Sequence, residues 1–147
     1  MKPVTVSATV SKSSRDVYEF LEVLANHELF MDRMFIDWQF SGPERGVGAR
    51  ARAKASAPAS QDWTEFEIIE AEPRRIVEEA VNAGGKRRTR STYLLEDLPN
   101  GRTRISFEFV WLEASRLERL GLPLARAFVR RANGSAMRRL AKRLAQR

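Results

Sequence analysis

Two adjacent glutamates in the segment IVEEAV, residues 76–81, are candidates for acid–base chemistry. The segment alternates as a strand does, and successive side chains of a strand point to opposite faces of its sheet. Glu78 and Glu79 therefore lie on different faces, and the pattern leaves open which of them points inward. An inward carboxyl group among apolar side chains has a raised pKa, because burial disfavours its charged form. Such a group is able to donate a proton near neutral pH.

Tyr93, His27 and Asp32 are the other side chains that could take part in proton transfer. Tyr93 is in phase with Thr89 and Ser91 on the inward face of its predicted strand, where its hydroxyl could act as a donor. We nevertheless expect Tyr93 to be a core aromatic residue whose hydroxyl has a partner. His27 is expected at the solvated start of a short helix, with Asp32 close to it.

The residue types that are missing exclude several kinds of site. The chain has no cysteine and a single histidine, so a thiolate nucleophile, a Cys-rich metal site and a His-based metal site are all excluded. A Ser–His–Asp set, a P-loop and a dinucleotide-binding glycine pattern are also missing from the sequence. We therefore expect no metal and no cofactor, and any catalysis would be cofactor-independent.

Length and composition indicate an ordinary globular protein. The chain has 147 residues, of which 43% are hydrophobic and 31% are charged, and we expect one domain spanning residues 1–147. The N-terminal segment MKPVTVSATV alternates apolar and polar residues, unlike the continuous apolar run of a signal peptide. Since no apolar run approaches the roughly 20 residues of a membrane span, we expect a cytoplasmic protein.

The order of the predicted elements is that of an α+β protein. Residues 4–11 alternate as a strand, and the segment SSRD then matches a helix-capping pattern that begins at Ser13. Apolar residues at 17, 20, 21 and 24 predict a helix, and Asn26 is expected to cap a second short helix near residues 27–33. Five turn-like segments (SGPERG, SAPASQ, AEP, NAGG and DLPNG) then bound six strands. After residue 114 the pattern is helical, with a break expected at Gly121–Pro123.

The segment GVGARARAKASA, residues 46–57, indicates which way its strand faces. Arg50, Arg52 and Lys54 share one face, and the alanines at 49, 51, 53 and 55 share the other. Burying three cations without partners is too costly, so the alanines face inward. The outward arginines are expected to form cross-strand ion pairs with glutamates. Four inward alanines leave volume that bulky side chains from elsewhere must fill, or that remains as a cavity.

Bulky aromatic side chains and these alanines are expected to line a cavity with mostly apolar walls, which is typical of a small-molecule site. On the strand before the alanines, Ile36, Trp38 and Phe40 are expected to share the inward face. The full set of predicted ligand-binding residues is Trp38, Phe40, Ala51, Ala53, Phe66, Tyr93, Phe107, Phe109 and Trp111. The pattern is equally consistent with a well-packed core.

Four segments carry a family resemblance through their order and spacing: VTVSATVSKSSRDVYEFL, GVGARARA, EIIEAEPRRIVEEAV and STYLLEDLPNGRTRISFEF. Together they span almost the whole chain, and they resemble the START/Bet v 1-like (SRPBCC) superfamily, in particular its polyketide cyclase/dehydrase and lipid-transport type. The resemblance implies a helix-grip fold, in which a bent antiparallel sheet of about seven strands wraps around a long C-terminal helix, with two short helices after the first strand.

The resemblance also implies a function. Its members bind lipids, sterols, polyketides or other hydrophobic aromatics in a cavity between sheet and helix, so we expect a binding or carrier protein for a small hydrophobic molecule. The alternative is a cofactor-independent polyketide cyclase or aromatase-type enzyme, for which Tyr93, Glu78 and Glu79 are the candidate catalytic residues.

The positive charge of the chain is concentrated in its C-terminal part. Residues 116–147 hold ten basic residues and one acidic residue, while the whole chain has a net charge of +7, so the remainder is slightly acidic. The basic helix could contact an anionic membrane surface, or the phosphates of a nucleic acid or ribosome as a third hypothesis. A solvated face that keeps the protein soluble is the interpretation that the pattern favours. The sequence does not indicate an oligomeric state.

Overall fold

The structure, a computed structural model, describes residues 2–56, 62–82, 87–113 and 122–147. These residues form strands β1 (Val4–Val10), β2 (Phe35–Ser41), β3 (Arg50–Ala55), β4 (Trp63–Glu72), β5 (Arg75–Asn82), β6 (Arg88–Leu98) and β7 (Arg102–Glu113). The helices are α1 (Ser14–Leu21), α2 (Glu28–Met31) and α4 (Leu122–Ala145), with short 3₁₀ turns η1 (Leu24–His27) and η2 (Pro99–Gly101).

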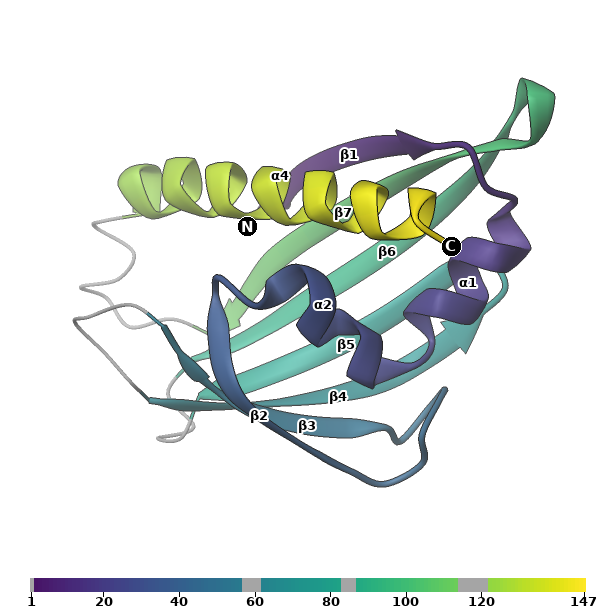
Figure 1. The fold of residues 1–147 in the computed structure, drawn as a ribbon. Coiled ribbons are helices and arrows are strands. Elements are labelled where there is room, and N and C mark those ends of the chain that lie inside the picture. The colour runs from purple at the N-terminus through teal and green to yellow at the C-terminus, as the bar shows by residue number, and fades with distance from the viewer. Residues whose placement is uncertain (1, 57–61, 83–86, 114–121) are drawn as a thin grey trace.

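The strands form one antiparallel sheet in the order β1-β7-β6-β5-β4-β3-β2. The sheet is strongly bent, and α4 lies across its concave side while α1 and α2 close the end near the C-terminus (Figure 1). The helix packs along β1 and also against α2. This arrangement confirms the expected α+β helix-grip architecture with two short helices after the first strand.

The helix that follows β1 begins where the sequence predicts. The hydroxyl of Ser13 accepts a hydrogen bond of 3.1 Å from the backbone N–H of Asp16, and Val17, Phe20 and Leu21 are buried. The second helix differs from the prediction, because Asn26 does not cap it. The side-chain amide of Asn26 instead donates to the carbonyl of Phe20, and the chain passes through η1 before α2 begins at Glu28.

Strand β3 has the predicted orientation. Its inward alanines, Ala51 and Ala53, are buried, while Arg50 and Arg52 are exposed on the convex face. Arg50 forms the expected cross-strand ion pair with Glu67, at 2.9 Å between Nε and Oε1.

Strand β2 corrects the prediction that Ile36, Trp38 and Phe40 share a face. Its register shifts between Ile36 and Gln39, where two residues oppose a single residue of β3, and Asp37 has a φ of 56°. A bulge of this kind reverses the alternation of a strand. As a result Ile36 pairs with the outward Lys54, and Phe35 joins Trp38 against the core.

The structure confirms the predicted turn in the segment DLPNG, between β6 and β7. In the turn between β6 and β7, Asn100 and Gly101 have positive φ angles of 66° and 69°, as a tight connection requires. Most of the predicted turns SAPASQ and NAGG, together with Gly121 of the expected helix break, lie outside the described residues.

Gly42, at the end of β2, is expected to tolerate no side chain. Its φ is +74°, and a Cβ there would lie 2.6 Å from the backbone oxygen of Gly48. Gly46 has a similar φ of +75° but no atom within 4 Å of a Cβ. We expect Gly42→Ala to lower the free energy of unfolding by more than about 2 kcal/mol and Gly46→Ala by about 1 kcal/mol, measured by urea denaturation. Equal losses would show that the close approach to Gly48 has no cost.

Candidate functional site

Three polar side chains from separate elements meet inside the otherwise apolar concave side of the sheet. They are His27 at the end of η1, Glu78 of β5 and Tyr93 of β6, and their exposed fractions are 1%, 3% and 0%. The rings of His27 and Tyr93 meet edge to face, with centroids 5.5 Å apart. An acid, a base and a hydroxyl are thereby brought together without contact with solvent.

His27 has its ring orientation set by the backbone. Its Nε2 lies 2.7 Å from the carbonyl oxygen of Leu21, which can only accept, so Nε2 carries a proton. Its Nδ1 faces Oε2 of Glu78 at 3.4 Å, but neither atom has a hydrogen-bond partner. The Nδ1 atom is therefore available to accept a hydrogen bond, either from Glu78 or from a bound molecule.

Glu78 is the inward member of the glutamate pair, which answers the question that the alternation left open. Burial raises the pKa of Glu78 above its ordinary value of 4.5, and the nearby His27 partly opposes that increase. Glu79 points to the convex face, where its carboxylate forms ion pairs with Arg90 at 2.9 Å and Arg88 at 3.8 Å. Glu79 therefore serves the outer surface and is not part of the site.

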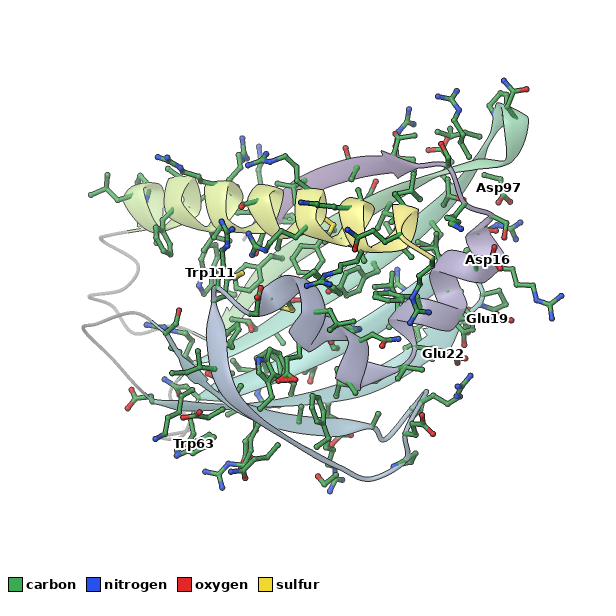
Figure 2. The ribbon with its side chains drawn as sticks, in the orientation of Figure 1. Asp16, Glu19, Glu22, Trp63, Asp97 and Trp111 are labelled. Carbon is green, nitrogen blue, oxygen red and sulfur yellow. The ribbon has the colours of Figure 1, made fainter. Side chains whose placement is uncertain are left out.

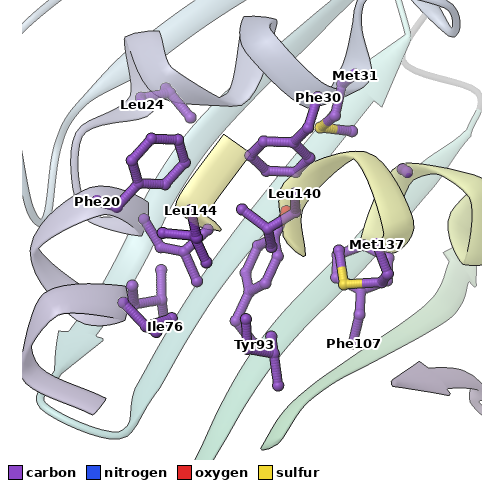
Figure 3. Close-up of a cluster of buried hydrophobic side chains, with 14 of the residues drawn as sticks. Phe20, Leu24, Phe30, Met31, Ile76, Tyr93, Phe107, Met137, Leu140 and Leu144 are labelled. Atoms are coloured by element: carbon purple, nitrogen blue, oxygen red, sulfur yellow. The ribbon is translucent and has the colours of Figure 1, made fainter. Parts of the chain in front are cut away.

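Tyr93 has a hydroxyl without a partner, which corrects the expectation that it would find one. Burial raises its pKa well above 10, and the neighbouring Glu78 carboxylate raises it further. The hydroxyl therefore stays protonated at neutral pH and is available as a hydrogen-bond donor. Figure 3 shows Tyr93 between the sheet and α4, gathered with Phe107, Met137 and Leu140.

The raised pKa of Glu78 predicts how stability depends on pH. Because the folded protein holds this proton more tightly than the unfolded chain, the contribution of Glu78 to stability falls as pH rises above 4.5. We expect Glu78→Gln to be more stable than the parent protein by about 1–3 kcal/mol at neutral pH, with the gain disappearing as pH falls to about 4.5. Urea unfolding at several pH values measures this difference.

Glu79→Gln is the matched control for that measurement. It removes a carboxylate one residue away that is paired on the convex face, so it should lower stability by at most about 1 kcal/mol, with no gain at neutral pH. A Glu78→Gln variant that is less stable than the parent at pH 7 would show that the buried carboxylate is well satisfied.

The predicted ligand-binding residues fall into two aromatic groups on the concave side, with Ala51 and Ala53 buried beneath the first. In that group Phe66 and Phe40 lie on either side of Trp38, with centroids 5.6 Å and 5.9 Å from its ring. Phe40 is 42% exposed and marks the edge of the group.

The second group lies on β6 and β7. The rings of Tyr93 and Phe107 have centroids 4.8 Å apart, and those of Phe109 and Trp111 are 4.9 Å apart. Both groups lie on the face that α4 crosses. Tyr93 belongs both to the second group and to the unpartnered cluster with His27 and Glu78, so the cluster is continuous with that group.

Four further side chains complete or correct the predicted site. His27 is buried rather than solvated, and its spacing of three residues from Leu24 and four from Met31 was a signal for this. Asn133 is buried on the inner face of α4 with its Nδ2 unpartnered, in phase with Val129 and Met137. Asp32, which directly follows α2, is by contrast largely exposed, and its Oδ1 lies 3.8 Å from Nε of Arg139. The fourth is Phe35, brought inward by the β2 bulge and in contact with Phe66.

Two hollows lined by described residues are on the outside of the protein. One, of about 520 Å³, is on the convex face between outward side chains of β3, β4 and β5, among them Arg52, Glu65 and Glu79. The other, of about 450 Å³, lies beside α4. Neither of these two hollows opens onto the concave cluster.

The described part of the chain offers neither a metal site nor a membrane-spanning helix. Within it, no group of three or more His, Asp or Glu side chains is placed to hold a metal ion. Among the helices so described, none has the length and apolar character needed to cross a bilayer.

Solved structures with the same architecture have very different sequences. A protein from Thermus thermophilus has a TM-score of 0.75 at 16% identity, covering 98% of this chain and 97% of that chain. A truncated norcoclaurine synthase from Thalictrum flavum has a TM-score of 0.74 at 13% identity, covering 100% and 98%. The Zhui aromatase/cyclase from Streptomyces sp. R1128 has a TM-score of 0.71 at 15% identity, covering 99% and 94%.

No protein-family model and no curated protein matches the sequence. Identities of this size establish a shared fold and leave ligand and activity to be argued from this chain's own residues. On the architecture in Figure 1 and these structural matches, the chain has a helix-grip fold, which it shares with a norcoclaurine synthase and an aromatase/cyclase.

Proposed function

We propose that this protein binds a small hydrophobic molecule that carries a hydrogen-bonding group, on the concave side of the sheet beneath α4. The apolar part of the molecule would contact the aromatic side chains of β6 and β7, and its polar group would meet His27, Glu78 and Tyr93. Binding or carriage, rather than catalysis, is the primary function proposed.

The observation that supports this proposal is the unpartnered state of three fully buried polar groups. A buried polar atom without a hydrogen bond costs about 1–3 kcal/mol, so a core that only needed stability would place apolar side chains there. Nδ1 of His27, Oε2 of Glu78 and the hydroxyl of Tyr93 all carry that cost. A ligand with an acceptor or donor group would remove it. The fold shared with a norcoclaurine synthase and an aromatase/cyclase is consistent with a ligand at this place.

A second candidate function is a cofactor-independent enzyme of the polyketide cyclase or aromatase type. It is favoured by the pairing of a carboxyl group of raised pKa with an imidazole nitrogen 3.4 Å away. In such an enzyme Glu78 and His27 would move a proton to or from the substrate, and the Tyr93 hydroxyl would donate to a developing oxyanion.

Native mass spectrometry of freshly purified protein tests the proposal, combined with organic extraction of the same sample. We expect a bound apolar compound to be released. In parallel, β-naphthol should bind to extracted protein more tightly than naphthalene, because only the naphthol offers a group to the buried cluster. Equal weak binding of both compounds, together with a bare protein mass, would contradict the proposal.

A further inference from the structure

The outer face of α4 combines unpaired positive charge with exposed apolar side chains. Residues 122–147 contain eight Lys or Arg residues and no acidic residue. Arg139 has Asp32 as a partner, Arg126 donates to the backbone carbonyl of Lys2, and Arg147 stacks on Phe20. The remaining five have no acidic partner within 4 Å in the described part of the chain: Arg130, Arg131, Arg138, Lys142 and Arg143.

Two large apolar side chains of the same helix are left in solvent. Leu124 is 81% exposed and Phe128 is 71% exposed, the highest values among the large hydrophobic residues of the described chain. Spacings of four and seven residues along a helix share a face, so Leu124 and Phe128 align with Arg131. Continued further, the same face carries Arg138 and Lys142. One side of α4 thus forms a stripe of about 27 Å that is apolar at its start and cationic beyond.

A shallow hollow lies next to the apolar start of this stripe. It has a volume of about 450 Å³ and is lined by Pro123, Arg126, Ala127, Arg130 and Arg131. The guanidinium group of Arg126 donates hydrogen bonds to the backbone carbonyls of Lys2 and Pro3, before β1, and these bonds hold one wall in place. The hollow therefore has a size and a charge suited to a phosphate-bearing headgroup.

Within the described part of the chain, no acidic side chain forms an ion pair with Arg130 or Arg131 near the beginning of α4. The acidic side chains labelled on α1, Asp16, Glu19 and Glu22, lie at the end of the molecule where α4 finishes, away from the beginning of α4 (Figure 2). The beginning of α4 is free to approach a negatively charged surface.

We propose that α4 docks this protein on an anionic lipid membrane, with Leu124 and Phe128 entering the headgroup region and Arg131, Arg138 and Lys142 contacting lipid phosphates. A helix with one basic and one apolar part lies in the plane of a membrane interface in this way. Phosphates of a nucleic acid would satisfy the arginines equally well, but they would leave exposed Leu124 and Phe128 without a contact. The two exposed apolar side chains therefore favour a membrane over a nucleic acid as the partner of α4.

Sedimentation with vesicles tests the proposal. Full-length protein should bind phosphatidylcholine vesicles that contain phosphatidylglycerol and should bind pure phosphatidylcholine vesicles much more weakly. Arg131→Gln/Arg138→Gln should weaken binding by roughly fivefold for each charge removed. Leu124→Ser/Phe128→Ser should weaken it by at least about tenfold, without changing net charge.

Matched control variants distinguish docking through α4 from nonspecific effects of net charge and of exposed apolar surface. Arg15→Gln/Arg102→Gln removes the same charge from exposed arginines elsewhere, and Ile36→Ser/Val47→Ser removes two exposed apolar side chains of β2 and the loop after it. Both controls should bind the anionic vesicles as the parent protein does. In Phe128→Trp, quenching of the new indole by brominated lipid should exceed that of the three native tryptophans, which places this residue in the bilayer.

Three outcomes overturn the proposal. One is vesicle binding that is lost equally in the controls, another is binding unaffected by Leu124→Ser/Phe128→Ser, and the third is binding to a labelled oligonucleotide at low salt with none to anionic vesicles. The vesicle assay does not depend on the concave cluster, since Glu78→Gln and Tyr93→Phe should dock normally. Failure of docking would therefore leave the proposed ligand site standing, and failure of ligand binding would leave docking standing.

Discussion

His27→Ala is expected to lower the free energy of unfolding by about 3–5 kcal/mol at neutral pH, because it removes the imidazole 3.4 Å from the buried Glu78 carboxyl and leaves a cavity in the core. Burial raises the pKa of Glu78 and the nearby His27 partly opposes that increase, so loss of the imidazole makes a charged carboxyl still less favourable. Loss of the ring contacts with Phe30 and Tyr93 adds to this. Urea unfolding at pH 7 measures the loss directly.

A double-mutant cycle separates the electrostatic part of that loss from the packing part. Glu78→Gln should stabilise the His27→Ala background by at least about 1 kcal/mol more than it stabilises the parent protein, since the carboxyl has lost the imidazole beside it. This difference should shrink as pH falls to about 4.5, where the carboxyl is protonated at no cost. If the two substitutions are simply additive at pH 7, the pair does not share a proton and the site loses its central feature.

The preference for β-naphthol over naphthalene should disappear when the Tyr93 hydroxyl is removed or the Glu78 carboxyl is replaced by an amide. In the parent protein β-naphthol is expected to bind more tightly than naphthalene, and Tyr93→Phe should lower the β-naphthol affinity by about 10- to 100-fold. Glu78→Gln should do the same at neutral pH while making the fold more stable. Isothermal titration of both compounds against each variant gives the affinities. A gain in stability with a loss of binding is the signature of a functional rather than a structural group.

The chain contains its own controls for this experiment. Tyr18→Phe removes the hydroxyl of the only other tyrosine, and Glu79→Gln removes the neighbouring carboxylate on the convex face. Neither should alter naphthol binding. Undiminished naphthol binding in Tyr93→Phe and Glu78→Gln would show that the naphthol binds elsewhere. Equal loss in the Tyr18→Phe control would point to a general effect on the fold.

Much of the fold follows from local pattern. The Ser13 cap, the inward alanines of β3 and the outward direction of its arginines are all properties of a few consecutive residues. Strand alternation and helix capping depend on the residues concerned and on solvent, so they can be deduced before any long-range contact is known. Which side chains of β2 point inward could not be deduced in this way. A bulge at Asp37 reverses the alternation of the strand, and the local sequence pattern does not indicate that bulge.

The site itself needed contacts between distant segments. Alternation along IVEEAV showed that one glutamate must point inward, but it treated Glu78 and Glu79 alike. Pairing of β5 with its neighbours decided between them, because Glu79 meets Arg90 on the convex face. His27 reaches Glu78 only because η1 and α2 fold over the concave side, which brings together residues 51 positions apart in the chain. Local propensity cannot predict that His27 and Glu78 lie side by side, since burial and charge pairing arise only when the whole chain has packed.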